Sequence, residues 1–240
     1  DPQGQGRGAR GRMNGPLWFR CVTAAGTYQV AFEPRDLVIA GLTGRDQAAV
    51  QHHVEELRAI GVKPPPTIPA FFRNGTNLLT TAHTVEVLGP DSSGEVEFVL
   101  VSMADGLWVG VGSDHTDRRV EAYAIDVSKQ LCPKVVAPVL WRFDDVAAHW
   151  DRLVLRAWIE EAGRMALYQE GTAAALRTPE SLAAAWTGGP PLPEGTVMFG
   201  GTFAAIGGIR PSVRFEFELE DPLLRRVIRH GYTARALPLS

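Results

Sequence analysis

Short runs of alternating apolar and polar residues recur along the chain, and they predict a protein built mainly of β-strands. Residues 17–41 contain β-branched and aromatic runs with a break at Gly26-Thr27, which indicates a small strand pair. The stretch from Thr76 to Val139 is mostly strand-like. Near the C-terminus, "VRFEFELE" alternates apolar with charged residues, as a half-exposed strand does.

One clear helical pattern lies in residues 44–61, where Val50, Val54 and Leu57 recur at helical spacing and Gly61 ends the run. The following segment, "VKPPPTIPAFFRNG", contains four prolines. Because proline removes a backbone donor and fixes φ, we expect this segment to be an extended connector rather than a regular element.

Two further segments predict helices in the second half of the chain. Residues 143–163 carry two aspartates, Asp144 and Asp145, near their start, and these acids suit the positive end of a helix. Residues 168–188 begin as a loop and continue as a helix capped by Thr178, with Pro179 in its first position.

The overall composition is that of an ordinary globular protein, with 45% hydrophobic residues, 21% charged residues and a formal net charge of −3. The absence of a basic excess argues against nucleic acid or an anionic membrane surface as a partner. No apolar run reaches the roughly 18 residues of a spanning helix. The two cysteines, Cys21 and Cys132, do not form a C-x-x-C motif, and a cytoplasmic location is expected.

The organisation along the chain suggests three parts. Residues 1–12 are rich in Gly and Arg and are interpreted as a flexible leader before a start at Met13. Residues 13–66 hold the N-terminal strands and the first helix, and residues 67–240 form a β-rich domain.

Carboxylates stand at both ends of an otherwise apolar strand pair in "GEVEFVLVSMADGLWVGVGSDHTDRRVE". Glu95 and Glu97 are two residues apart, so they share one face of a strand. A turn at Asp105-Gly106 would place Glu97 directly opposite Asp114, with their Cβ atoms roughly 5 Å apart.

Two interpretations of these acids stay open at this point. The acids could form the solvated polar end of a hairpin. Alternatively, because opposed like charges destabilise a sheet, a hard divalent cation such as Mg²⁺ or Mn²⁺ could bind between them.

The acidic motifs resemble those of the fumarylacetoacetate hydrolase superfamily. The family pattern E-x-E is similar to "EVE", and N-D-x-S-A-R-D-x-Q is similar to "SDHTDRRVE", with Ser113, Asp117, Arg119 and Glu121 as departures. The resemblance implies an α+β, β-rich fold with a rolled mixed β-sheet, covered by the N-terminal helix as a lid. It also implies that the metal ligands are Glu95, Glu97 and Asp114.

Further motifs follow in the family's order. "HHVEEL" resembles the family's H-x-x-E segment, "SKQLCPKVVAP" its active-site lysine segment, "YQEGT" its Q-D-G-x-T motif and "FGGTF" its T-G-T-P motif. These matches imply catalytic roles for His53, Glu56 and Lys129, and substrate-binding roles for Arg118, Gln169, Gly201 and Thr202. His52 and Glu55 repeat the same spacing and are an alternative catalytic pair.

The function implied by the resemblance is that of a metal-dependent hydrolase or lyase. It would act on a small 2-oxo or 1,3-dicarbonyl acid and cleave a C–C bond through an enolate, with His53 activating a water and Lys129 giving electrostatic support. Decarboxylation, isomerisation and dehydration are alternatives, as is a catalytically silent binding protein with the same fold. The resemblance also implies a homodimer.

Overall fold

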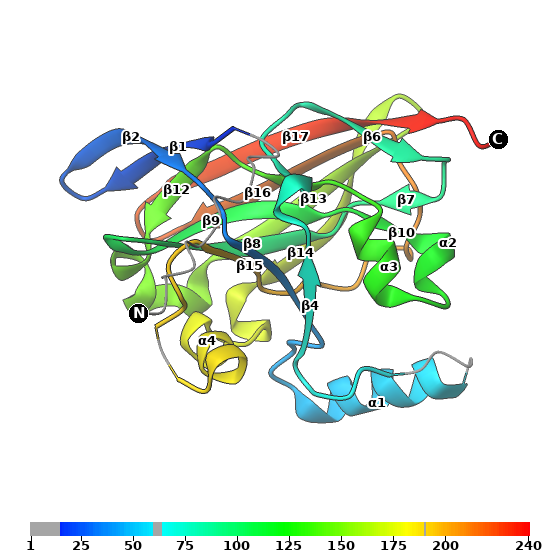
Figure 1. Cartoon of the computed structure of the whole chain (residues 1–240), viewed down its shortest axis with the longest axis horizontal. Helices are drawn as coiled ribbons and strands as arrows, with labels where there is room; N and C mark the ends of the chain where they lie inside the picture. Colours follow the sequence, from blue (N-terminus) through cyan, green and yellow to red (C-terminus); the bar gives the residue numbers. More distant parts are fainter. Residues whose placement is uncertain (1–14, 60–63, 190) are drawn as a thin grey trace, which may run out of the picture.

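The computed structural model describes residues 15–59, 64–189 and 191–240, which form a β-rich molecule with few helices (Figure 1). The predicted leader at residues 1–12 and the predicted helix end at Gly61 lie outside these residues. The prediction of a β-rich α+β fold with mixed sheets is confirmed.

The larger sheet has ten strands. Its main path follows the order β2-β1-β12-β9-β8-β15-β3-β4. Strand β11 pairs with both β9 and β5, so these two strands also belong to the sheet. The sheet is mixed, because β1 is parallel to β12 and β3 is parallel to β15, whereas β8 and β9 form an antiparallel hairpin. Its strands are β1 (Leu17–Thr23), β2 (Gly26–Phe32), β3 (Asp36–Gly41), β4 (Ala70–Asn74), β5 (Leu79–Thr80), β8 (Val96–Met103), β9 (Gly106–Asp114), β11 (Lys134–Val136), β12 (Val139–Arg142) and β15 (Thr196–Phe199).

This sheet combines strands from both sides of the boundary predicted at residues 66 and 67. Strand β1 pairs with β12, and β3 pairs with β15. The N-terminal strands and the strands that carry the acidic motifs are therefore parts of one sheet.

The second sheet has five strands in the order β14-β13-β16-β17-β6, and a separate strand pair joins β10 to β7. These strands are β6 (Thr84–Leu88), β7 (Ser92–Ser93), β10 (Thr116–Asp117), β13 (Val154–Glu161), β14 (Arg164–Thr172), β16 (Arg214–Asp221) and β17 (Arg226–Leu237). The predicted half-exposed strand "VRFEFELE" is confirmed as β16.

The core lies on both faces of the β8–β9 hairpin, which explains its nearly continuous apolar sequence. Phe98 and Val111 belong to the cluster that also contains Phe217 of the second sheet. Val99 and Trp108 point to the other face and pack in a separate cluster with β1, β3 and β15. All residues of β8 are buried.

The helices are α1 (Gln47–Ala59), α2 (Arg118–Glu121), α3 (Ile125–Gln130) and α4 (Pro179–Thr187), with short 3-10 segments η1 (Thr76–Leu78), η2 (Phe143–Asp145), η3 (Ala147–Arg152) and η4 (Ala173–Ala175). The predicted α1 and α4 are confirmed as helices. In Figure 1, α1 lies at the lower edge of the molecule, apart from α2 and α3, and its role as a lid stays a prediction. Every helix among the described residues is too short or too polar to cross a membrane.

Some predicted elements were wrong. Residues 143–163 form η2, η3 and then strand β13, because Val154–Glu161 alternates half-exposed with buried residues, a period of two rather than 3.6. The loop expected at the start of residues 168–188 belongs to strand β14. The end of the proline-rich connector forms β4, where the prolines have stopped and backbone donors are available to pair with β3.

The predicted register of the acidic hairpin was also wrong. Met103 pairs with Gly106, so the turn residues are Ala104 and Asp105, and Glu97 lies opposite Gly112 rather than Asp114. Asp105 is held in the turn by the indole N–H of Trp108, which donates to its carboxylate at 2.9 Å. Since the register error is an even number of residues, every side chain stays on its predicted face.

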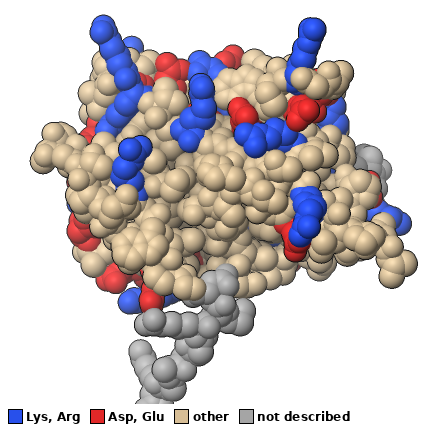
Figure 2. Space-filling model, turned by 90° about the horizontal axis from the view of Figure 1, so that it is seen from above, with Lys and Arg blue, Asp and Glu red and all other residues tan. Residues whose placement is uncertain are grey.

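On the molecular face shown in Figure 2, basic and acidic side chains are interspersed over a largely uncharged surface. The Lys and Arg side chains on this face stand separately and form no continuous basic patch. This distribution agrees with the small net charge of −3.

Candidate metal centre

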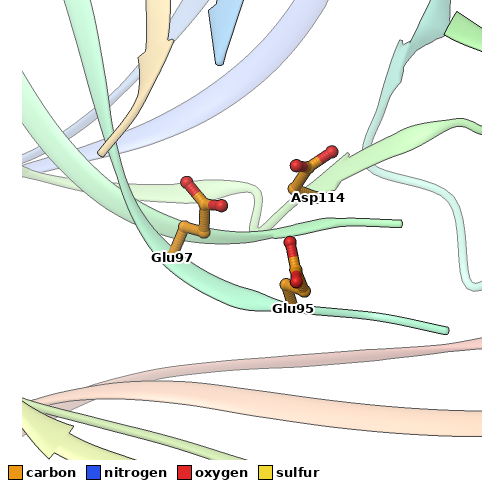
Figure 3. Close-up of side chains that lie close together, drawn as sticks. All are labelled: Glu95, Glu97 and Asp114. Atoms are coloured by element: carbon orange, nitrogen blue, oxygen red, sulfur yellow. The ribbon is translucent and has the colours of Figure 1, made fainter. Parts of the chain in front are cut away.

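Three carboxylates meet where β8 begins and β9 ends. Glu95 directly precedes β8, Glu97 lies within it, and Asp114 is the last residue of β9. Figure 3 shows the three carboxylates around a common space. One oxygen from each lies within 4.8 Å of the others, so a single ion could contact all three.

The hairpin positions these acids by its alternation and by a glycine. Asp114 N donates to Glu95 O at 3.0 Å, and this bond brings the two acidic segments side by side. Gly112 lies opposite Glu97, where a Cβ would approach Val135 O to 2.7 Å and the Phe199 ring to 2.8 Å. A larger residue there would push the hairpin away from β11 and β15.

Basic side chains surround the acids. Arg118 Nη1 lies 3.1 Å from Glu95 Oε1, and Lys129 Nζ donates to Asp114 Oδ2. Lys129 is on helix α3. Lys134 Nζ lies 2.9 Å from Asp114 Oδ1, in an ion pair that lacks hydrogen-bond geometry.

Lys134 is a site residue that the sequence analysis missed. It is fully buried, and its ammonium donates to the carbonyl of His115 at 2.6 Å. The available signal was a lysine placed directly before the apolar run "VVA", where a charge needs a partner. A divalent ion was the predicted counter-charge of the acids, whereas the fold also supplies three basic side chains.

The surroundings shift the pKa values of the two buried acids, Glu97 and Asp114, in opposite directions. Burial raises the pKa of Glu97 well above its usual range, and the nearby Asp114 and Glu95 carboxylates add to the effect. Burial would also raise the pKa of Asp114, but the Lys129 and Lys134 ammoniums outweigh it and hold that pKa below its usual range. Burial opposes the charge on Lys129, yet Asp114 and Glu95 raise the pKa of this ammonium.

The loop after β15 contacts Glu97 through its backbone. Gly201 N donates to Glu97 Oε2 at 2.7 Å. Gly201 has φ +104°, and a Cβ at this position would overlap Thr43 Oγ1. Glycine is therefore required for this amide to reach the carboxylate.

Gln169 and Thr202 hold the same loop against β8. Gln169 Oε1 accepts from Val96 N at 2.9 Å, and its amide nitrogen donates to Thr202 Oγ1 at 2.8 Å and to Phe203 O at 2.7 Å. Thr202 Oγ1 donates to Val96 O at 2.7 Å. Both side chains are thus engaged with protein groups, and their predicted contact with a substrate stays a prediction.

Arg118 keeps one free donor beside the acids. Its Nε donates to Ser93 Oγ at 2.7 Å, and its Nη1 donates to Glu121 Oε2 at 2.8 Å. Its Nη2 is buried and has no hydrogen-bond partner among the described residues. This N–H group is a donor that could donate to an anionic ligand.

A second buried network lies behind the acids. The His115 ring contacts Tyr232 Oη at 2.6 Å and Ser92 Oγ at 2.8 Å, and Tyr232 Oη is 2.8 Å from Ser113 Oγ. Burial lowers the pKa of His115 to about 3, so its ring is neutral at physiological pH.

The predicted catalytic pair is on α1, but the side chains of His53 and Glu56 lie outside the described part of the structure. The alternative pair, His52 and Glu55, is exposed on the same helix. Assignment of a general base stays a prediction.

The donor set fits a divalent cation. Carboxylate oxygens are the ligands that Mg²⁺ and Mn²⁺ prefer. Asp114 Oδ1 is buried and has no hydrogen-bond donor among the described residues, although the Lys134 ammonium lies 2.9 Å away. Either ion could be held by Glu95, Glu97 and Asp114.

A family model covers most of the chain. Residues 40–232 match the family model described as "Protein of unknown function (DUF2848)". The chain belongs to the DUF2848 family. A search of curated proteins finds no match for it.

Solved structures show what fold the DUF2848 chain has. The structure of Cg1458 with inhibitor is 14% identical with a TM-score of 0.63, over 89% of this chain and 81% of that one. The structure of 2-keto-3-deoxy-D-arabinonate dehydratase complexed with magnesium and 2,5-dioxopentanoate is 17% identical with a TM-score of 0.59, over 85% and 75%. These similarities show that the chain shares the fold of both structures.

Proposed function

We propose that this DUF2848 chain is a divalent-metal-dependent enzyme that acts on a small 2-oxo or 1,3-dicarbonyl acid. The observation that carries the proposal is the convergence of Glu95, Glu97 and Asp114 within 4.8 Å, with the Lys129 ammonium against Asp114. A cation-binding set of acids beside a buried lysine supports chemistry in which negative charge develops on a substrate oxygen.

The metal is proposed to be Mg²⁺ or Mn²⁺, held by the three carboxylates. When bound, it would supply Lewis acidity toward the oxo and carboxylate oxygens of the substrate.

The chain's own residues would complete the site. Lys129, which is nearly buried and also lies 3.9 Å from Glu95, would stabilise a developing oxyanion. The Arg118 guanidinium would orient the substrate carboxylate through its free Nη2 donor. Gly201 would keep Glu97 in place through its backbone amide, with Gln169 and Thr202 fixing the loop.

C–C bond hydrolysis is the first reaction proposed, with His53, oriented by Glu56, removing a proton from the attacking water. Dehydration is the second, and the similarity to a dehydratase complexed with magnesium and 2,5-dioxopentanoate favours it. Both reactions share an enolate-like transition state, so Lys129 has the same role in each. Decarboxylation and isomerisation would use the same step.

The proposal is tested by metal binding and turnover. Mn²⁺ titrated into the metal-stripped protein should bind at one site and raise the stability by about 2.7 kcal/mol at 100 times its Kd. Glu97→Gln should weaken Mn²⁺ binding more than about tenfold, because it removes one ligand charge. Glu86→Gln, at an exposed position on β6, is the matched control and should bind Mn²⁺ as the wild type does.

Turnover should be screened with acylpyruvates, oxaloacetate and sugar-derived 2-oxo acids in the presence of Mg²⁺ or Mn²⁺. Activity that survives exhaustive chelation would contradict the metal-dependent mechanism. Metal binding without turnover of any 2-oxo acid would favour the catalytically silent alternative. The homodimer stays a prediction that sedimentation analysis would check.

A further inference from the structure

Two lysines contact the same buried carboxylate. Lys129 Nζ donates to Asp114 Oδ2, while Lys134 Nζ lies 2.9 Å from Oδ1. One lysine would be sufficient to balance the charge of one aspartate. The second lysine therefore needs its own explanation.

Basic side chains neutralise much of the charge of these acids without any bound ion. Arg118 contacts Glu95 and also Glu121, and both lysines contact Asp114. A buried carboxylate without a counter-charge would be strongly destabilising. With these cations present, the site can fold before a metal arrives.

Lys134 differs from the other two cations because the sheet fixes it in place. It begins β11, where it pairs with Asp114 of β9 on one side and with Leu79 of β5 on the other. Its side chain has no solvent exposure, and its ammonium also donates to His115 O. Lys129 is on a short helix, is slightly exposed, and has Glu95 as a second neighbour 3.9 Å away.

The positive charge of Lys134 next to Asp114 repels any second cation that binds the same carboxylate. A cation that binds Asp114 on the side of Glu95 and Glu97 would be close to the Lys134 ammonium, in an interior where charges are weakly screened. Lys129 has Glu95 as a second carboxylate neighbour, whereas the Lys134 ammonium is fully buried and is held by Asp114 Oδ1 and the His115 carbonyl.

We infer that Lys134 is a built-in counter-ion of Asp114 that stabilises the metal-free site and lowers its affinity for a divalent cation. Lys134 is in this sense a positioning residue, and the inference rests on the metal site of the proposed function. It predicts a metal that exchanges readily rather than one that stays with the protein throughout its lifetime.

The test is isothermal titration with Mn²⁺ alone, near neutral pH, on the wild type, Lys134→Met and Lys134→Gln. Both substitutions remove the charge, and Gln keeps a donor for the His115 carbonyl. We expect both to bind Mn²⁺ at least about tenfold more tightly than the wild type. They should also be less stable than the wild type in chelator and gain more stability from Mn²⁺.

The direction of the change in Kd for Mn²⁺ distinguishes this role from a merely structural one. If Lys134 only kept Asp114 in position, its loss would weaken Mn²⁺ binding. Arg119→Met, which removes an exposed charge on α2, is the control and should leave the Kd unchanged. Unchanged or weaker binding in the folded Lys134 variants would overturn the inference. Failure of both variants to fold even with saturating Mn²⁺ would also overturn it, whereas folding that requires Mn²⁺ would support it.

The result also separates this inference from the proposed function. If the wild type binds Mn²⁺ and both Lys134 variants bind it equally well, the inference fails and the metal site stands. If only the Lys134 variants bind Mn²⁺, the inference stands and the wild type is not a metal-dependent enzyme.

Discussion

At the scale of single residues, the site depends on small residues as much as on charged ones. Gly201 brings its amide to Glu97 only because it adopts φ +104° and leaves room for Thr43. Gly112 lets the acidic hairpin approach β11 and β15 closely. The chemistry of the carboxylates is thus controlled by positions that carry no functional group.

Gly201→Ala should therefore destabilise the protein by more than the cost of the left-handed backbone alone. Left-handed backbone costs a non-glycine residue about 1–2 kcal/mol, and the overlap with Thr43 adds to this cost. Gly208→Ala is the matched control, because Gly208 has φ +88° but open space around its Cβ position. Thermal unfolding should show a clearly lower Tm for Gly201→Ala, and equal Tm values would show that the contact with Thr43 is unimportant.

At the scale of elements, local sequence signals predicted an element correctly where residues within or next to that element stabilise it. Helix α4 has Thr178 as its N-cap, whose hydroxyl accepts from Ser181 N, and Gly188 as its C-cap, in the left-handed region. Residues 143–163 were mistaken for a helix, because Asp144 and Asp145 resemble a helix start. They lie in η2, and the alternating residues of β13 begin only at Val154.

Thr178→Ala should lower the free energy of unfolding by about 1 kcal/mol, since it removes the N-cap of α4. Thr178→Ser retains the hydroxyl and should stay within a few tenths of a kcal/mol of the wild type. Urea unfolding measures both variants. A Ser variant as unstable as the Ala variant would show that the methyl group, and not the cap, matters.

At the scale of the whole molecule, the second sheet contains a histidine that ties it to the chain before β6. His230 on β17 is nearly buried, with its ring 4.4 Å from that of His83 and 5.8 Å from that of Phe217. Burial lowers the pKa of His230 to about 4, with further lowering by His83 and Arg214, although the backbone carbonyls of residues 81 and 82 oppose the effect.

This histidine should make the fold sensitive to acid. Between about pH 6.5 and pH 4 the unfolded chain binds a proton at His230 that the folded chain does not, so stability falls as the pH falls through this window. The loss should reach about 1–2 kcal/mol by about pH 5.

His230→Gln should reduce this acid sensitivity, as measured by urea unfolding at neutral pH and near pH 5. His52→Gln, on the exposed face of α1, should behave as the wild type does. An unchanged pH dependence in His230→Gln would assign the effect to other groups.

The amino-acid sequence by itself determined the β-rich class, the helices α1 and α4, and the three acids that meet at the end of the β8–β9 hairpin. These features follow from periodicity, from cap residues and from the two-residue repeat of a strand, all of which act over short distances along the chain. The acids stayed on one face despite the wrong register, because an even shift preserves alternation.

Only the tertiary structure decided what surrounds those acids. Lys134 reaches Asp114 because β11 pairs with β9, and Gly201 reaches Glu97 because β15 pairs with β8. Such contacts depend on which strands become neighbours in the sheet, and strand order is set by the packing of the whole core. No local pattern around Lys134 or Gly201 contains that information.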